Sequence, residues 1–435
     1  MADTHTRAHT RAHTHYPGPE TIRRHVLPNG LVILAYENFA TESIVIEGVV
    51  RAGALGERAD KAGLAAFTTA LLDRGTTQRS FADIYEALEA VGADVAFSCD
   101  KHHVDFGASG LVEDVDLALA LLAESLRQPT FPAQQVEQVR GQILTNLVMR
   151  ANDTGRLARL AFHELLYPNH PYGRSVTGYQ DTIQAITRDE IAQFHQDYFG
   201  PQGMIVTIVG AIAAEKAVEK VTAVFGDWHN PHQEPLPVAP SAERPSALIR
   251  AHIPMPDKAQ SDLLLGLPGP LRTAPDYLDA SLMNTILGVF GMMGRIGQSV
   301  REEQGLAYYA YSRLQGSLGP APWSAGAGVS PENVEQAIAA IRAEIGRIQT
   351  ELVSDEELAD SQAFRIGSVP VSLETNSGLA GVIGDLEFHS LGLDYLQRFP
   401  DLIRAITPER VQAAAQKYLS TDQLAVAVAG PAPGG

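Results

Sequence analysis

Hydrophobic and polar positions alternate with different periods along the chain, and the period predicts the type of each element. Residues 28–30 form a Pro-Asn-Gly turn between two β-rich runs, which is typical of a hairpin. Further β-rich runs predict strands at 43–52, 94–98 and 104–109. Apolar residues at helical spacing predict helices at 63–75, 81–91, 113–127 and 133–149. Because strands and helices do not alternate strictly, we expect an α+β fold in which helices are layered on sheets.

An internal repeat indicates how the chain is organised. Residues 186–211 (ITRDEIAQFHQDYFGPQGMIVTIVGA) and 406–431 (ITPERVQAAAQKYLSTDQLAVAVAGP) align without a gap at an offset of 220 residues. Identical residues meet at Ile186/Ile406, Thr187/Thr407, Tyr198/Tyr418 and Gly210/Gly430. Both copies predict a helix with a Thr-led start that runs into a short buried strand. Two copies at so long a period predict a duplicated domain, with chance similarity of two helix–strand units as the alternative.

A polar, proline-rich stretch at 226–246 separates the two copies and has the composition of a linker. The chain therefore divides near residue 235. The predicted parts are a disordered His-rich tail, an N-terminal domain, a linker and a C-terminal domain, at 1–21, 22–233, 234–247 and 248–435. The tail carries a small repeat of His5, His9, His13 and His15, which could bind metal weakly if it were ordered, although its composition favours disorder.

Composition excludes several classes of partner. The chain has 435 residues with 45% apolar and 19% charged residues, as in ordinary globular proteins. Its formal charge of −18 argues against nucleic acid or an anionic membrane as partner. Cys99 is the single cysteine, so an internal disulfide and a cysteine-based zinc cluster are excluded. We find no secretory signal and no apolar run of the length that spans a membrane, and therefore expect a cytoplasmic protein.

The stretch 63–76, GLAAFTTALLDRGT, places Ala66, Thr69 and Ala70 at i, i+3 and i+4, on one face of the predicted helix. This frame resembles the pitrilysin/insulinase/mitochondrial processing peptidase family of zinc peptidases, where it carries His-x-x-Glu-His. In that family the two histidines ligate zinc, and the glutamate is the general base that activates the zinc-bound water. Methyl groups cannot bind zinc, and a threonine hydroxyl is neither a usual ligand nor a base near neutral pH.

The family's third zinc ligand is a glutamate on a later long helix. The matching stretch here, Thr145-Asn146-Leu147, holds Asn146 and no carboxylate. Other histidines do not replace the site: His163-Glu164 begins like the motif but ends in Tyr167, and His102 and His103 are adjacent on a predicted strand, which points them to opposite faces. We therefore expect no metal in this chain and no zinc peptidase activity from the chain alone.

Residues 285–312, TILGVFGMMGRIGQSVREEQGLAYYAYS, resemble the family's Val-Arg-Glu-x-x-Gly-Leu-Ala-Tyr stretch. In the family, an Arg and a Tyr seven residues later project into the substrate chamber, and Arg301 and Tyr308 match that pair in type and spacing. A guanidinium donates hydrogen bonds to substrate carbonyls, and a phenol donates to the oxygen that becomes anionic in a tetrahedral intermediate. The alternative makes Arg301 a surface helix residue and Tyr308 a core aromatic.

The resemblance covers about residues 22 to 432 and implies two homologous α+β domains, each an antiparallel-rich sheet covered by helices, as in processing peptidases and LuxS-like metallohydrolases. It implies the zinc-less, non-catalytic subunit of a heterodimer whose homologous partner carries the zinc. Arg301 and Tyr308 would then bind a peptide substrate at the partner's zinc. The alternatives are a structural relative and a homodimeric peptide-binding protein, neither with a part in proteolysis.

Overall fold

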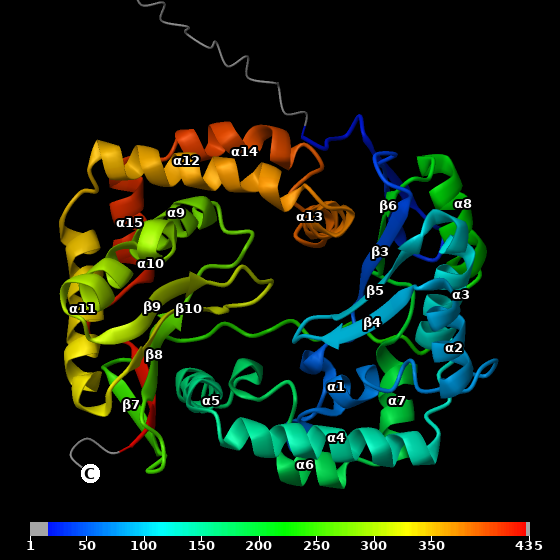
Figure 1. The fold of residues 1–435 in the computed structure, drawn as a ribbon, viewed down its shortest axis with the longest axis horizontal. Helices are drawn as coiled ribbons and strands as arrows, with labels where there is room; N and C mark the ends of the chain where they lie inside the picture. The colour runs from blue at the N-terminus through cyan, green and yellow to red at the C-terminus, as the bar shows by residue number, and fades with distance from the viewer. Residues whose placement is uncertain (1–15, 432–435) are drawn as a thin grey trace, which may run out of the picture.

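The computed structural model describes residues 16–431, apart from the side chains of residues 291–293. It consists of two halves, each built on one sheet with helices packed against it (Figure 1). The four histidines of the predicted N-terminal tail lie outside the described residues. In the described part of the chain, no helix has the length and apolar character needed to cross a membrane.

The first sheet has six strands in the order β1 (Ile22–Val26), β2 (Val32–Glu37), β6 (Ile205–Gly210), β3 (Ser43–Val50), β5 (Val104–Leu111) and β4 (Asp94–Cys99). Only the pair β2–β6 is parallel. The predicted hairpin is confirmed: β1 and β2 are antiparallel, and the turn between them contains Gly30 with φ of 91°. This left-handed conformation is one that glycine adopts without a steric penalty.

The second sheet has five strands in the order β7 (Ile249–Pro254), β11 (Ala425–Gly430), β8 (Ser261–Pro268), β10 (Pro322–Val329) and β9 (Ala307–Leu314). Here the pair β7–β11 is parallel and the other pairs are antiparallel. This arrangement repeats that of the first sheet from β2 onward. Two homologous α+β domains with antiparallel-rich sheets, as predicted, are thereby confirmed.

The internal repeat appears as the same helix and strand in each half. Helix α7 (Arg188–Tyr198) leads into β6, and helix α15 (Pro408–Tyr418) leads into β11, with both bounds of each element 220 residues apart. Thr187 and Thr407 cap the two helices with their side chains, and each strand is buried along its whole length. The ungapped alignment therefore reflects a structural duplication.

The remaining helices of the first half are α1 (Leu64–Thr69), α2 (Phe81–Val91), α3 (Val115–Arg127), α4 (Ala133–Ala151), α5 (Thr154–Leu166), α6 (Gln180–Ala185) and α8 (Ala214–Phe225). Those of the second half are α9 (Tyr277–Gly288), α10 (Phe290–Gly297), α11 (Val334–Thr350), α12 (Asp355–Ser372), α13 (Asn376–Phe388) and α14 (Tyr395–Arg404). A π-helical turn, η5 (Gln298–Glu303), continues α10. Residues 226–248 contain neither a helix nor a strand, which suits the predicted linker, while the exact domain limits stay a prediction.

The two halves exchange a helix. Helix α5 of the first half packs against β7, β8 and β11 of the second sheet, and α13 of the second half packs against β3 and β6 of the first sheet (Figure 1). Apolar side chains of α13 (Leu379, Ala380 and Ile383) share a buried cluster with residues of the first sheet. An ion pair of 2.8 Å between Arg24 and Glu387 also joins the halves. Part of the inner face of each sheet is therefore covered by a helix from the opposite half of the chain.

Candidate functional site

Helix α1 carries the three positions at which the resembled family has its zinc motif. Ala66 and Thr69 lie in the helix and Ala70 follows its last residue. The helix is shorter than the sequence predicted. It ends at Thr69, and the chain continues in turns up to Gly75. The hydroxyls of Thr68 and Thr69 donate to carbonyl oxygens four residues earlier, at 2.8 Å each. Such bonds compete with the helical pattern and weaken its continuation.

The residues present do not fit a catalytic zinc ion. Ala66 and Ala70 offer methyl groups, and the hydroxyl of the buried Thr69 already donates to the Ala65 carbonyl. Burial raises the pKa of the nearby Cys99 thiol, so the thiol stays protonated. Asn146 lies exposed on α4. Within residues 16–431, no group of three or more His, Cys, Asp or Glu side chains is arranged to hold a metal ion. We assign no zinc-dependent step to this chain's own residues.

Glu57 is a residue of this site that the sequence analysis missed. Its buried carboxylate accepts hydrogen bonds from the backbone amides of Gly63 (3.2 Å) and Ala65 (3.1 Å), at the start of α1. Burial raises the pKa of Glu57 to about 7, although the hydrogen bonds oppose the shift. The approach of Glu57 requires a left-handed turn at Gly63, whose φ is 97°. A glutamate six residues before a glycine is too common a pattern to have revealed this contact.

The histidines considered in the sequence are held in structural contacts. His102 and His103 lie in the turn between β4 and β5, and not on a strand as predicted, because β5 begins only at Val104. His102 shares a hydrogen bond with the Tyr172 hydroxyl, and His103 lies 3.1 Å from an oxygen of Asp105. Burial lowers the pKa of His163 to about 4, so this side chain is neutral at pH 7.

Arg301 and Tyr308 lie on two consecutive elements of the second half. Arg301 belongs to η5, and Tyr308 is the second residue of β9. The chain reverses between them, with hydrogen bonds from the Gly305 amide to the Arg301 carbonyl (3.1 Å) and from the Leu306 amide to the Val300 carbonyl (2.9 Å). The turn therefore keeps both residues at the same end of β9.

The Tyr308 side chain is not the core aromatic of the alternative interpretation, since it is 83% exposed. In the β9–β10 pairing, Tyr309 lies opposite Gly328 and Ala307 opposite Val329, which leaves Tyr308 as the extra residue of a bulge. Bulges redirect side chains away from the regular alternation of a strand. Within residues 16–431 the Tyr308 hydroxyl has no hydrogen-bond partner, and Arg301 forms one ion pair, with 3.4 Å between its Nε and an oxygen of Glu302. The Tyr308 hydroxyl and the other guanidinium nitrogens of Arg301 are thus available to a ligand.

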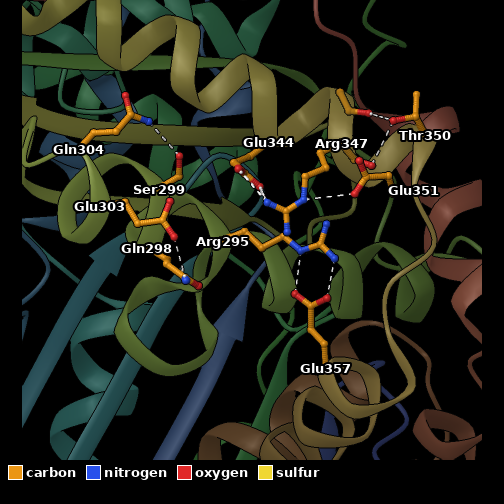
Figure 2. A network of polar contacts seen from close by, with 11 residues as sticks. Arg295, Gln298, Ser299, Glu303, Gln304, Glu344, Arg347, Thr350, Glu351 and Glu357 are labelled. Carbon is orange, nitrogen blue, oxygen red and sulfur yellow. Dashed lines mark hydrogen bonds and ion pairs between the residues drawn. The ribbon is translucent and has the colours of Figure 1, made fainter.

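A polar network supports the helix turn that carries Arg301 (Figure 2). Buried Arg295 of α10 forms a two-pronged contact with Glu357 of α12, at 2.7 and 2.5 Å. Gln298 donates to Glu303 at 3.0 Å within η5, and Gln304, the residue after η5, donates to Ser299 at 3.1 Å. Paired guanidinium–carboxylate contacts fix geometry in two directions. The network therefore holds η5 in place while leaving Arg301 outside it.

The chain has two repeated α+β halves, and helix α1, at the place of the family's zinc-motif helix, lacks the zinc ligands. These features define a non-catalytic relative of two-domain metallopeptidases. The chain belongs to the M16 (insulinase) peptidase family. The model "Insulinase (Peptidase family M16)" matches residues 32–179, and the model "Peptidase M16 inactive domain" matches residues 185–364. Together they match most of the chain, in agreement with the resemblance noted in the sequence.

Individual relatives agree with this assignment. An uncharacterized zinc protease of Streptomyces coelicolor is 29% identical, and the alignment covers 92% of this chain and 88% of that protein. An uncharacterized zinc protease of Mycobacterium leprae is 27% identical, and the alignment covers 94% of this chain and 91% of that protein. The crystal structure of a peptidase M16 inactive domain from Pseudomonas fluorescens is 26% identical, with a TM-score of 0.88 and 94% and 98% covered. A Helicobacter pylori protease has the same fold, with a TM-score of 0.89, 19% identity, and 96% and 100% covered.

Proposed function

We propose that this chain is the non-catalytic subunit of a heterodimeric zinc peptidase and that Arg301 and Tyr308 bind a peptide at the active site of a homologous partner. The observation that carries the proposal is the contrast between two sites. The α1 face has no zinc ligands, whereas in the described residues the Tyr308 hydroxyl is unpaired and Arg301 pairs only with its neighbour Glu302, at 3.4 Å. As the sequence predicts, we place the complex in the cytoplasm.

In this proposal the partner's zinc supplies the Lewis acid, and the residues of this chain orient the peptide. The Arg301 guanidinium donates hydrogen bonds to peptide carbonyl oxygens. The Tyr308 phenol donates to the oxygen on which negative charge develops. Removal of one such donor typically lowers the rate on the order of 10²-fold to 10³-fold.

The position of Tyr308 also supports binding of an extended peptide. β9 is the last strand of its sheet, so one edge of its backbone has no strand partner within the described residues. Exposed sheet edges bind extended peptides through main-chain hydrogen bonds, which select backbone rather than sequence. An unstructured peptide lying along β9 would pass the Tyr308 side chain.

The experiment measures hydrolysis of an unstructured fluorogenic peptide by this chain alone, by its closest homologue with His-x-x-Glu-His, and by the mixture. We expect activity only in the mixture. Arg301→Ala and Tyr308→Phe should each lower kcat/KM on the order of 10²-fold. Arg404→Ala and Tyr85→Phe serve as matched controls on helices away from β9 and should leave the rate unchanged.

A mixture no faster than the homologue alone would contradict the subunit proposal and leave a structural role. Hydrolysis by this chain alone, abolished by a chelator, would contradict the interpretation of the Ala66/Thr69/Ala70 face. Unchanged rates in both variants of the active mixture would retain the heterodimer and exclude Arg301 and Tyr308 from substrate binding.

A further inference from the structure

A cavity whose lining includes neither Arg301 nor Tyr308 lies where the two halves meet. It has a volume of about 550 Å³ and is bounded by the turn after β4, by the end of α4, by α5 between residues 156 and 163, by residues 172–177, and by the segment between β9 and β10. Five basic side chains line it: Lys101, Arg150, Arg156, Arg159 and Arg174. Asp100 is the one carboxylate among the described lining residues.

The positive charges of this cavity are largely uncompensated. Within residues 16–431, no carboxylate lies within 4.0 Å of the charged nitrogens of Lys101, Arg150, Arg159 or Arg174, and Arg156 has only Asp153, at 3.7 Å. The Arg174 Nε is buried and has no acceptor in the described residues. In a chain with a net charge of −18, so many unpaired cations in one cavity are not explained by composition.

Neutral contacts hold two of these cations in position. Arg150 donates to the hydroxyls of Ser175 (2.8 Å) and Thr177 (3.0 Å), and Lys101 donates to the carbonyl oxygens of Pro171 (3.1 Å) and Arg174 (2.8 Å). These partners satisfy hydrogen bonds without neutralising charge, so the cations are preorganised before a ligand arrives.

The buried acid Glu57 does not neutralise the cavity. Glu57 interacts with Arg174 and Lys101 at longer range, but its carboxylate is engaged by the amides at the start of α1 and does not line the cavity. Burial lowers the pKa of Lys101 to about 8, so its ammonium group remains mostly charged at pH 7.

We infer that this cavity binds the carboxylates of an acidic peptide segment. Guanidinium groups recognise carboxylates with paired hydrogen bonds, and Arg159 is exposed at the mouth with no ion pair in the described residues. Leu160, Val176 and Pro322 add apolar wall that suits the aliphatic part of a peptide. The volume is in the usual range of ligand sites, and the overall acidity of the chain disfavours nucleic acid. The inference concerns this chain alone and does not depend on a zinc-bearing partner.

Fluorescence anisotropy with a labelled pentapeptide of Asp and Glu tests the inference on the full chain without a partner. We expect binding that weakens as salt is raised, and no binding of the matched pentapeptide of Asn and Gln. Arg159→Gln should weaken binding about tenfold or more, the effect of losing a hydrogen bond to a charged group. Arg23→Gln, on the exposed edge strand β1, removes the same charge away from the cavity and should leave the Kd unchanged.

Arg174→Gln provides a second variant of the cavity lining. Thermal unfolding verifies that the Arg159→Gln and Arg174→Gln variants remain folded. Equal affinity for the acidic and neutral pentapeptides, or an unchanged Kd in a folded Arg159→Gln variant, would overturn the inference. Competition distinguishes other anions. If inorganic phosphate or a uridine oligonucleotide bound through Arg159 while the acidic pentapeptide did not, the acidic peptide would be excluded as the ligand.

Discussion

At the scale of single residues, Glu57 caps the start of helix α1. Glu57 accepts the first amides of the helix, which are the groups that a helix leaves without an internal partner. A carboxylate at this position is also favoured by the helix dipole. Its burial nevertheless disfavours the charged form, and the pKa of about 7 shows that burial is the larger effect.

Glu57→Gln should change how stability depends on pH. The folded protein holds the Glu57 proton up to about pH 7, whereas the unfolded chain releases it near pH 4.5, so this group lowers the free energy of unfolding as pH rises between these values. Relative to the wild type, the variant should gain about 1–3 kcal/mol between pH 4.5 and 7. Urea unfolding at several pH values measures the difference.

Glu89→Gln, on the exposed side of α2 and away from α1, makes the same substitution and is the control. A constant difference between Glu57→Gln and the wild type across this window would mean that Glu57 titrates near its ordinary pKa in the folded protein.

At the scale of elements, the two copies of the helix–strand unit differ in the hydrogen bonds that cap their helices. The Thr187 hydroxyl accepts from the Glu190 amide at 3.3 Å, and the Glu190 side chain accepts in return from the Thr187 amide at 2.8 Å. The copy at Thr407 accepts from the Arg410 amide at 3.4 Å and has Arg410 where the first copy has Glu190. Only the first copy thus forms a reciprocal capping box.

Thr187→Ala should therefore lower the free energy of unfolding by about 1 kcal/mol, and Thr407→Ala by less. Urea unfolding measures both. Thr145→Ala, on the exposed face of α4, removes a threonine that caps nothing and is the control. A larger loss at Thr407 than at Thr187 would contradict the assignment of the stronger cap to the first copy.

At the scale of the whole molecule, the exchanged helices make each half depend on the other. Without α13, the first sheet would expose the apolar face that includes Leu34, Ile205 and Val209. Without α5, the second half would lose Phe162 and Leu166 from a buried cluster with Leu264 and Ala425. Burial of a large apolar side chain contributes roughly 1.5–3 kcal/mol, so each isolated half loses a substantial part of its core.

The separately expressed halves, residues 1–233 and 234–435, should therefore aggregate or bind a hydrophobic dye, whereas co-expression should restore a compact 1:1 complex. Size-exclusion chromatography and dye fluorescence of the two halves, alone and together, measure this dependence. The unsplit chain is the control. Two halves that are each monomeric, compact and free of dye would show that the helix exchange contributes little to folding.

The sequence by itself determined what depends on local spacing. Strand and helix types follow from period and turn residues, the duplication follows from an ungapped alignment, and the missing zinc ligands follow from the identities of Ala66, Thr69 and Ala70. Local pattern was insufficient at the ends of elements. Helix α1, whose threonine hydroxyls bond to its own backbone, is shorter than predicted. His102 lies in a turn and not on a strand, because β5 begins only at Val104.

Only the tertiary structure decided which distant segments meet. Four features join side chains from separate elements. They are the exchange of α5 and α13, the exposure of Tyr308 at a bulge, the capping of α1 by Glu57, and the cavity lined by Lys101, Arg150, Arg159 and Arg174. Periodicity records which face of an element is apolar but not which surface covers it. The partner of each face, and the charges that meet beside it, are set by packing of the whole chain.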